Sequence, residues 1–175
     1  MTEYKMKIVG CKTCINDVND FITKVNKFAE QNNIEIQLFD ASLIFGKPHL
    51  DSAFAHALRS CRRKETATRS LGMELLFYAS GERQITRAIK KMGVKKGESS
   101  IIVCLLYPLE FNHDIDKIVK EFIQCFDLNQ DDSVTQPDKS MLSTFGISKK
   151  AQSSVKKDQI YQLVLEKIAL VDIIK

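Results

Sequence analysis

One stretch of this 175-residue chain carries side chains whose types and order suggest chemistry: Ser80-Gly81-Glu82-Arg83-Gln84. The apolar pattern predicts a helix over 82–92, with Ser80 as its cap. Free backbone N–H groups at a helix start attract an anion, Gly81 lets a ligand come close, and Arg83 can bind a phosphate with two hydrogen bonds. Gln84 can then read a base edge. The stretch therefore predicts a contact to nucleic acid.

Other basic side chains extend this prediction. Arg87 and Lys90 or Lys91 follow Arg83 at helical spacing, which is typical of a surface that tracks a nucleic-acid backbone. A second basic cluster precedes the stretch, and the net charge of +4 permits RNA contact without demanding it. A solvated helix face is the alternative reading of the stripe. The predicted RNA-binding residues are Ser80, Gly81, Arg83, Gln84, Arg87, Arg59, Arg62, Arg63 and Lys64.

A second candidate is the pair Cys11 and Cys14, a CxxC motif near the end of a predicted strand. It leaves open a small thiol-dependent or metal-dependent enzyme as an alternative function. An odd total of five cysteines argues against a disulfide framework, and incidental thiols are the preferred interpretation. His49 and His56 are interpreted as surface imidazoles. Nucleotide-binding and hydrolase fingerprints are absent from the sequence, so we expect no enzyme, no catalytic residues, no metal and no cofactor.

The C-terminal segment is apolar nearly all round, which is more than one core-facing stripe requires. A short helix over 139–147 precedes it. We therefore expect a partner protein to cover part of this region, with completion of the chain's own core as the alternative. The predicted partner-binding residues are Met141, Leu142, Phe145, Ile168 and Ile173.

These candidates need elements to position them. Apolar residues make up 44% and charged residues 27% of the chain, as in one ordinary globular domain over 1–175. Alternation predicts strands near 4–12 and 34–38, and continuous apolarity predicts a buried central strand over 99–107. The segment 129–138 is polar and acidic, and is predicted to be a mobile loop. The predicted helices cover about 18–31, 48–63, 70–78, 82–92, 114–126, 139–147 and 159–174.

The longest apolar run, from Ile101 to Leu106, is far shorter than the roughly 20 residues of a membrane helix. Lys5 and Lys7 lie where a signal peptide would be apolar. We therefore expect a cytoplasmic chain with no membrane partner, and one also found in the nucleus if the source is a eukaryote.

Several of these motifs together resemble a known family. They are Phe45-Gly46-Lys47-Pro48-His49-Leu50, the helix from Ala53 to Arg63, Thr68-Arg69-Ser70-Leu71 with Glu74-Leu75-Leu76, Tyr78 to Ile85 with Ala88-Ile89, Phe145-Gly146-Ile147, and Leu163 to Leu170. This set is similar to the TPRKB family, the small accessory subunit of the KEOPS tRNA-modifying complex. The Ser-Gly-Glu-Arg-Gln-Ile stretch is its most specific part.

The resemblance implies a non-catalytic role in making threonylcarbamoyladenosine in tRNA. It implies that the chain binds and stimulates the kinase-like ATPase subunit of KEOPS, called PRPK in humans, and holds the single-stranded 3′ CCA end of tRNA. It also implies an α/β fold of the α+β kind: a single domain with a small, largely antiparallel sheet of about four strands and helices packed around it.

Overall fold

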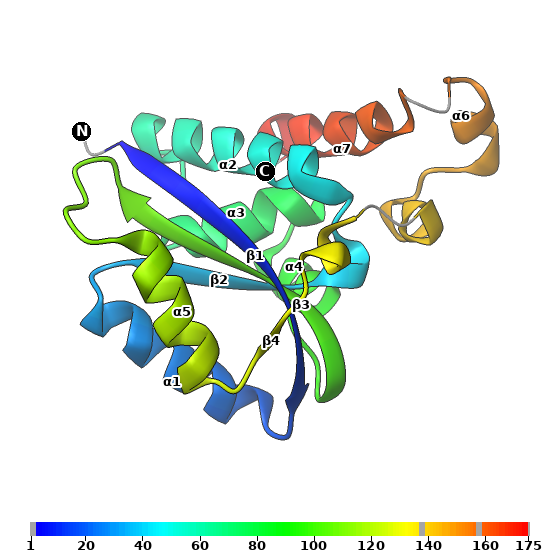
Figure 1. The fold of residues 1–175 in the computed structure, drawn as a ribbon. Coiled ribbons are helices and arrows are strands. Elements are labelled where there is room, and N and C mark those ends of the chain that lie inside the picture. The colour runs from blue at the N-terminus through cyan, green and yellow to red at the C-terminus, as the bar shows by residue number, and fades with distance from the viewer. Residues whose placement is uncertain (1–2, 137–138, 157–158, 175) are drawn as a thin grey trace.

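A computed structural model describes residues 3–136, 139–156 and 159–174. Its centre is an antiparallel sheet of four strands in the order β2–β3–β1–β4 (Figure 1). The strands are β1 (Tyr4–Ile15), β2 (Glu35–Asp40), β3 (Gly97–Pro108) and β4 (Asn129–Gln130). The predicted α+β class with a small antiparallel sheet is therefore confirmed.

The central strand β3 is buried on both faces, which explains its continuous apolar sequence. Successive side chains of a strand point to opposite faces, so its residues alternate between two cores. Ile102, Cys104 and Leu106 belong to one core, whereas Ile101, Val103 and Leu105 belong to the other.

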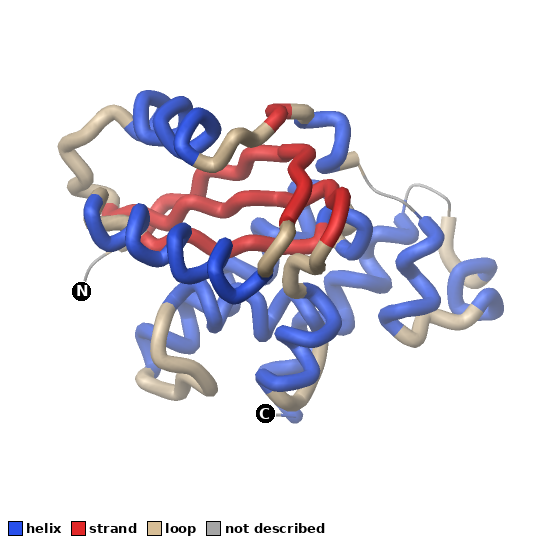
Figure 2. The backbone as a smooth tube through the Cα atoms, turned by 90° about the horizontal axis from the view of Figure 1, so that it is seen from below, coloured by secondary structure: helices blue, strands red, loops and turns tan. Residues whose placement is uncertain are grey.

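Helices cover both faces of the sheet (Figures 1 and 2). On one face lie α1 (Val18–Gln31) and α5 (Ile115–Cys125), whose first turns are capped by the carboxylates of Asp17 and Asp114. The other face carries the longer layer of helices, which surrounds the candidate site. These helices are α2 (Gly46–Arg63), α3 (Leu71–Ser80), α4 (Ile85–Met92) and α7 (Ile160–Ile174).

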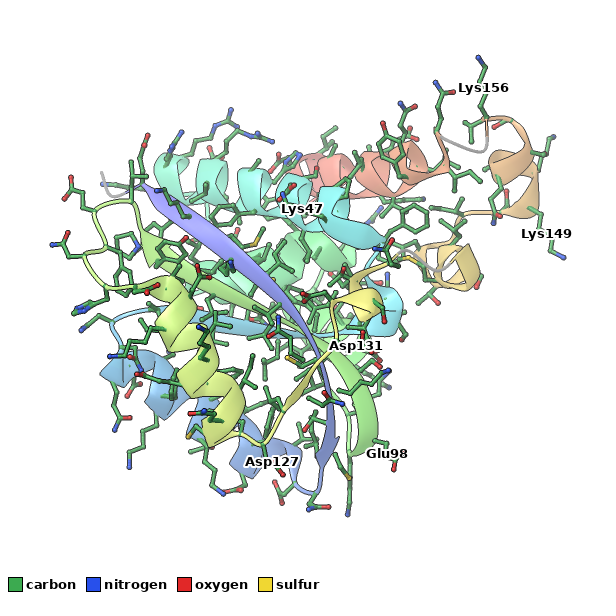
Figure 3. The ribbon with its side chains drawn as sticks, viewed as in Figure 1. Lys47, Glu98, Asp127, Asp131, Lys149 and Lys156 are labelled. Atoms are coloured by element: carbon green, nitrogen blue, oxygen red, sulfur yellow. The ribbon has the colours of Figure 1, made fainter. Side chains whose placement is uncertain are left out.

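Short elements join these parts, and most of them were not predicted. η1 (Ala41–Leu43) and η2 (Asp132–Thr135) are 3-10 turns, and η3 (Lys139–Phe145) is the predicted short helix in 3-10 form. α6 (Lys149–Ser153) is capped by the Ser148 hydroxyl, which accepts from Ala151 N–H. Figure 3 shows Lys149 and Lys156 extending from this end of the molecule. None of the helices in the described part of the chain has the length and apolarity for a membrane crossing.

The acidic segment, predicted to be a mobile loop, contains two short elements, β4 and η2, and is docked on β1. Residues 129–130 form β4, and Asp131 pairs with Lys12 at 2.6 Å, a hydrogen bond that lowers the pKa of Asp131 to about 2 (Figure 3). Gly10 N–H donates to Asp132 Oδ1 at 3.1 Å. A Cβ atom on Gly10 would lie 2.6 Å from the Asp131 carbonyl oxygen, so only glycine permits this approach. Residues 137 and 138 lie outside the described residues, and the mobility of the segment stays a prediction.

Candidate functional site

The Ser80–Gln84 stretch ends one helix and precedes the next, so the predicted helix start at Ser80 is wrong. Ser80 is the last residue of α3, Gly81 adopts the left-handed conformation (φ 65°) that commonly ends a helix, and α4 begins only at Ile85. The pair Ser80-Gly81 is compatible with a helix start and with a helix end. In the structure, the helix formed by the preceding apolar run continues to Ser80. The Ser80 side chain is fully buried; its hydroxyl donates to Phe77 O at 2.7 Å and accepts from Glu82 N–H at 3.0 Å.

Lys91 holds this corner from inside, a role that the sequence analysis missed. Its ammonium donates to Ser80 O at 2.8 Å and to a Glu82 carboxylate oxygen at 3.1 Å, and lies 4.0 Å from the centre of the Phe145 ring. Only 12% of the side chain is exposed. Burial lowers the pKa of Lys91, with the Glu82 carboxylate acting in the opposite direction. The α3–α4 corner (residues 80–84) is therefore fixed to η3 and α4.

The fixed corner leaves its basic and amide side chains outside. Arg83, Gln84 and Arg87 are exposed, and Gln84 precedes α4 without any side-chain hydrogen bond to that helix. The first turn of α4 is therefore flanked in sequence by two exposed arginines, Arg83 and Arg87, an arrangement that favours an anion such as phosphate. The predicted anion site moves from Ser80 to the start of α4, and the buried Ser80 side chain is not part of its surface.

The second basic cluster lies on the α2–α3 loop (residues 64–70) and the helix end before it. Arg59, Arg62, Arg63 and Lys64 are all exposed, and Lys64 ends α2 in the left-handed conformation. The loop folds around the buried carboxylate of Glu74, which accepts from Ser60 Oγ (2.9 Å), Ala67 N–H (3.1 Å), Thr68 N–H (3.1 Å) and Thr68 Oγ1 (2.8 Å). Sequence reasoning also missed Glu74, although its position in the apolar run Leu71–Tyr78 was a usable signal.

The structure does not bring the two basic clusters together. α2 and α3 are antiparallel: His49 near the start of α2 bonds to Ala79 at the end of α3, and Ser60 near the end of α2 bonds to Glu74 near the start of α3. From position 49 to position 60 a helix rises roughly 16 Å. Arg83 and Arg87 therefore lie at one end of this helix pair and Arg59–Lys64 at the other, so one phosphate cannot contact both.

Most of the predicted partner-binding residues are buried in the core of the chain. Met141, Leu142, Phe145 and Ile168 are buried in the cluster formed with α2, α3 and α7. Ile173 is different, because 77% of it is exposed. Leu170 and Tyr161 on the same helix are also exposed, so the outer side of α7 carries apolar residues beside the polar Gln162 and Glu166. The apolar pattern was correct, but it does not distinguish a helix covered by its own domain from one covered by a partner.

α7 is attached to α2 and α3 through the carboxylate of Asp172. This carboxylate accepts a hydrogen bond from the Tyr78 hydroxyl and pairs with His56 Nδ1 at 2.7 Å. His56 is thus mostly covered, and His49 is fully buried, which corrects the expectation of two surface imidazoles. Phe45 N–H donates to His49 Nδ1 at 2.9 Å and His49 Nε2–H donates to Ala79 O at 2.8 Å, which requires a neutral ring. Burial lowers the pKa of His49 to about 4.

The geometry of the cysteine pair does not support a dithiol or metal site. Both residues lie within β1, where residues three apart point to opposite faces and are separated by about 10 Å. Cys11 is buried and Cys14 is exposed, and burial raises the pKa of the Cys11 thiol to about 11. Across the described residues, no group of three or more His, Cys, Asp or Glu side chains is arranged to hold a metal ion.

Comparison with known proteins identifies the family of the chain. A family model described as "Kinase binding protein CGI-121" matches residues 15–172. The curated "Regulatory protein Cgi121" of Methanocaldococcus jannaschii is 28% identical over 121 residues, which cover 58% of this chain and 78% of that protein. Because the model spans most of the chain, the resemblance seen in the sequence is confirmed: the chain belongs to the CGI-121 (TPRKB) family of kinase-binding regulatory proteins.

Proposed function

We propose that this chain is a non-catalytic subunit of the KEOPS complex, which binds and stimulates the kinase-like ATPase subunit and holds the 3′ CCA end of tRNA during threonylcarbamoyladenosine synthesis. The proposal of a kinase-like partner is based on membership of the kinase-binding family. The RNA contact rests on one observation above all: Arg83 and Gln84 are exposed on a corner that Lys91 fixes from inside, and Arg87 is exposed in the first turn of α4. A fixed corner binds with a smaller loss of conformational entropy than a flexible one.

The two basic clusters have different tasks in this proposal. The α3–α4 corner grips the single-stranded end, where unstacked bases offer their edges and phosphates lie next to the start of α4. The cluster Arg59–Lys64, at the far end of the helix pair, contacts phosphates of the tRNA body and contributes affinity without reading sequence.

A binding comparison at one fixed salt concentration tests this division. Arg83→Glu weakens binding of intact tRNA by about tenfold or more, but changes little for tRNA lacking its last three nucleotides. Arg62→Glu, the matched charge reversal at the other end, weakens both tRNAs by a similar factor. Equal binding of the two tRNAs by the unmodified chain would contradict the CCA contact.

For the kinase-like subunit, the proposed docking surface is the outer side of α7, with Ile173 and Leu170 at its centre. Ile173→Glu lowers the affinity for that subunit by about tenfold or more and leaves the melting temperature within about 2 °C of the original. Ile22→Glu is the matched control, because it places the same charge on an exposed isoleucine of α1 across the sheet.

The alternative is that the short helix before α7 only completes the core of the chain. Leu142→Glu tests it, because this substitution puts a carboxylate into the core and lowers the melting temperature steeply. Unchanged partner affinity in Ile173→Glu would exclude the outer side of α7 as the interface. ATPase stimulation by the folded variants then shows whether docking and stimulation use the same surface.

A further inference from the structure

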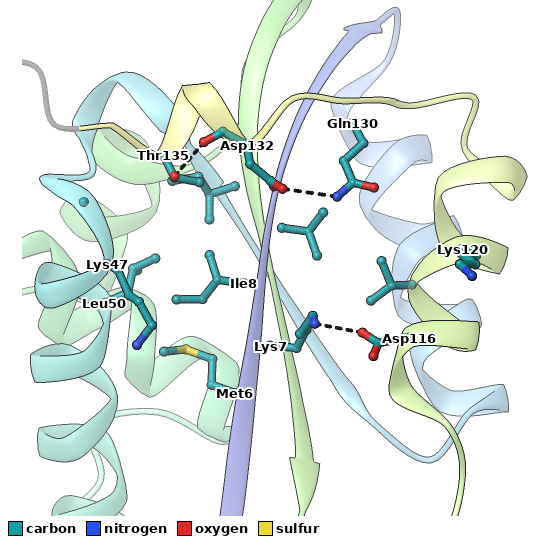
Figure 4. A pocket seen from close by; sticks show the side chains of 14 residues that line it. Met6, Lys7, Ile8, Lys47, Leu50, Asp116, Lys120, Gln130, Asp132 and Thr135 are labelled. Carbon is teal, nitrogen blue, oxygen red and sulfur yellow. Dashed lines mark hydrogen bonds and ion pairs between the residues drawn. The ribbon is translucent and has the colours of Figure 1, made fainter.

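A groove of about 660 Å³ runs along the open edge of β1 and belongs to neither surface proposed above (Figure 4). β4 pairs with β1 only at Cys11 and Lys12. Within the described residues, no strand pairs with the edge from Tyr4 to Val9, a length of about 20 Å. The fold therefore leaves half of a long strand with one unoccupied edge.

The backbone groups on this edge point into the groove. Asp131 N–H donates to Gly10 O at 2.9 Å and Gly10 N–H donates to Asp132 Oδ1, so Gly10 directs both of its backbone groups away from β3. Along an antiparallel strand this direction alternates from residue to residue. Ile8 and Met6 therefore also present their N–H and C=O groups to the open side, whereas Lys7 and Val9 bond to β3.

Two helices wall the groove. Leu50 and Lys47 of α2 form one side, next to the half-buried side chains of Met6 and Ile8 (Figure 4). Across β1, Asp116, Val119 and Lys120 of α5 form the other side, where Lys7 pairs with Asp116 at 2.8 Å. The α2 side is thus largely apolar at its base and the α5 side is polar.

The walls decide what can occupy the edge. A sheet edge that belongs to a folded domain, including a second copy of this chain, carries its own flanking helices and would meet α2 and α5 before reaching β1. A single extended segment has no such flanks. β4 is such an extended segment. It lies on the same edge of β1, where Asn129 and Gln130 pair with the strand.

We propose that this groove binds an extended peptide of another protein, which adds to the sheet as a further strand beside β1 and continues the line of β4. Main-chain hydrogen bonds to Met6 and Ile8 give affinity, and alternate side chains give specificity. Residues of one parity are apolar and lie against Met6, Ile8 and Leu50. Those of the other parity face α5, where Lys120 and the ion pair of Lys7 with Asp116 line the groove, so an acidic side chain is favoured beside Lys120.

The probe is a phage-displayed library of random ten-residue peptides, selected against the full chain, with the strongest binders synthesised. Hydrogen exchange in the free chain is expected to be fast at the Met6 and Ile8 amides and slow at Lys7 and Val9. A bound peptide slows exchange at Met6 and Ile8 by about tenfold or more, because their N–H groups become paired.

Two matched comparisons sharpen the result. N-methylation of alternate peptide residues weakens binding by about tenfold in one parity only, because a strand pairs with β1 through one of its edges. Lys120→Glu weakens acidic peptides several-fold, whereas Lys117→Glu, an exposed lysine of the same helix outside the groove, has little effect. Neither test needs a change in the sheet itself.

Three outcomes overturn the proposal: no peptide is selected, the selected peptides leave the Met6 and Ile8 amides exchanging as in the free chain, or N-methylation is tolerated in both parities. If a CCA-ended oligonucleotide instead protects those two amides, the groove is a nucleic-acid site and the peptide proposal is wrong. The test does not involve the α3–α4 corner or α7, so its failure leaves the proposed function untouched.

Discussion

The loops on either side of α3 each carry exposed basic residues and are each held by one charged side chain, but the two arrangements differ. Glu74 holds the α2–α3 loop with hydrogen bonds from close sequence neighbours, namely Ser60, Ala67 and Thr68. Lys91 holds the α3–α4 corner together with a carboxylate, and with an aromatic ring that comes from η3. The first loop is thus assembled locally, whereas the second depends on parts of the chain far away in sequence.

The two ends of the helix pair should therefore respond differently to acid and to substitutions elsewhere in the chain. In the α2–α3 loop the acceptor, Glu74, is fully buried and its donors are neutral groups. We therefore expect Glu74 to stabilise the conformation of the loop strongly. At the α3–α4 corner, Lys91 and the neutral ring of His49 lie close together, and burial lowers the pKa of both. We expect acid and distant substitutions to act on the corner first.

Removal of Glu74 has the largest expected effect. Glu74→Ala leaves the N–H groups of Ala67 and Thr68 without their acceptor, and leaves two hydroxyls with only a carbonyl oxygen each, which should lower the free energy of unfolding by about 3–4 kcal/mol. Urea unfolding measures the change. Glu166→Ala, an exposed carboxylate of α7, is the control and should cost under about 0.5 kcal/mol. A loss below about 1 kcal/mol for Glu74→Ala would remove the basis of the comparison.

Acid should weaken the corner through His49. Its pKa is about 4 in the folded chain against 6.5 in the unfolded one, so the unfolded chain binds more protons between these values. Stability is therefore full above pH 6.5 and falls by about 3 kcal/mol as the pH drops to 4. Urea unfolding over this range measures the slope.

His49→Gln should flatten that slope, whatever its effect at neutral pH. The Asp131 carboxylate titrates separately, because its pKa is lowered from 3.8 to about 2 and its contribution is lost only below that window. A slope that persists in the variant would assign the acid response to another group.

Lys91→Met should have an intermediate effect. It leaves Ser80 O without its donor and Glu82 without its ion pair, at a cost of about 1–2 kcal/mol. Amide exchange at Glu82 and Arg83 should become faster, while exchange in the α2–α3 loop should not change. Lys90→Met, on the exposed side of α4, is the matched control. Similar effects of both substitutions would show that Lys91 does not hold the corner.

The smallest effect is expected for the ion pair between Arg62 and Glu3, which are 3.4 Å apart and both largely exposed. Arg62→Gln should change the free energy of unfolding by less than about 0.5 kcal/mol, because solvent and salt screen such pairs. The same variant should still weaken tRNA binding if the α2–α3 end contacts phosphates. A clear loss of stability would mean that the basic cluster also supports the fold.

The sequence was sufficient for most of the fold because the long elements have strong periodic patterns. α2, α5 and α7 lie close to their predicted bounds, and β3 was recognised from its continuous apolar run. Errors arose where short-range chemistry is ambiguous. Ser80-Gly81 fits a helix start and a helix end equally well, and only the packing of α3 decides between them.

The candidate site was only partly predictable for a related reason. Clusters of arginines can be recognised in a sequence. The distance between the two basic clusters, however, depends on the antiparallel packing of α2 and α3. His49 was assigned to the surface because a polar residue normally lies there, whereas two hydrogen bonds permit its burial. The partners of the Lys91 ammonium are in other elements, namely the α3–α4 corner and the Phe145 ring of η3, so no local sequence pattern identifies its role.

The pairing of β1 with β3 also determines when the molecule can fold. β1 is made first on the ribosome, yet the strand that accepts it runs from Gly97 to Pro108 and is made much later. β2 waits for the same strand. Such distant pairing carries a large loop-closure cost and slows folding, and it leaves apolar strand edges uncovered in the nascent chain. We therefore expect chaperone dependence during synthesis to continue until α5 and α7 have also emerged, because residues of these later helices complete the two cores that β3 separates.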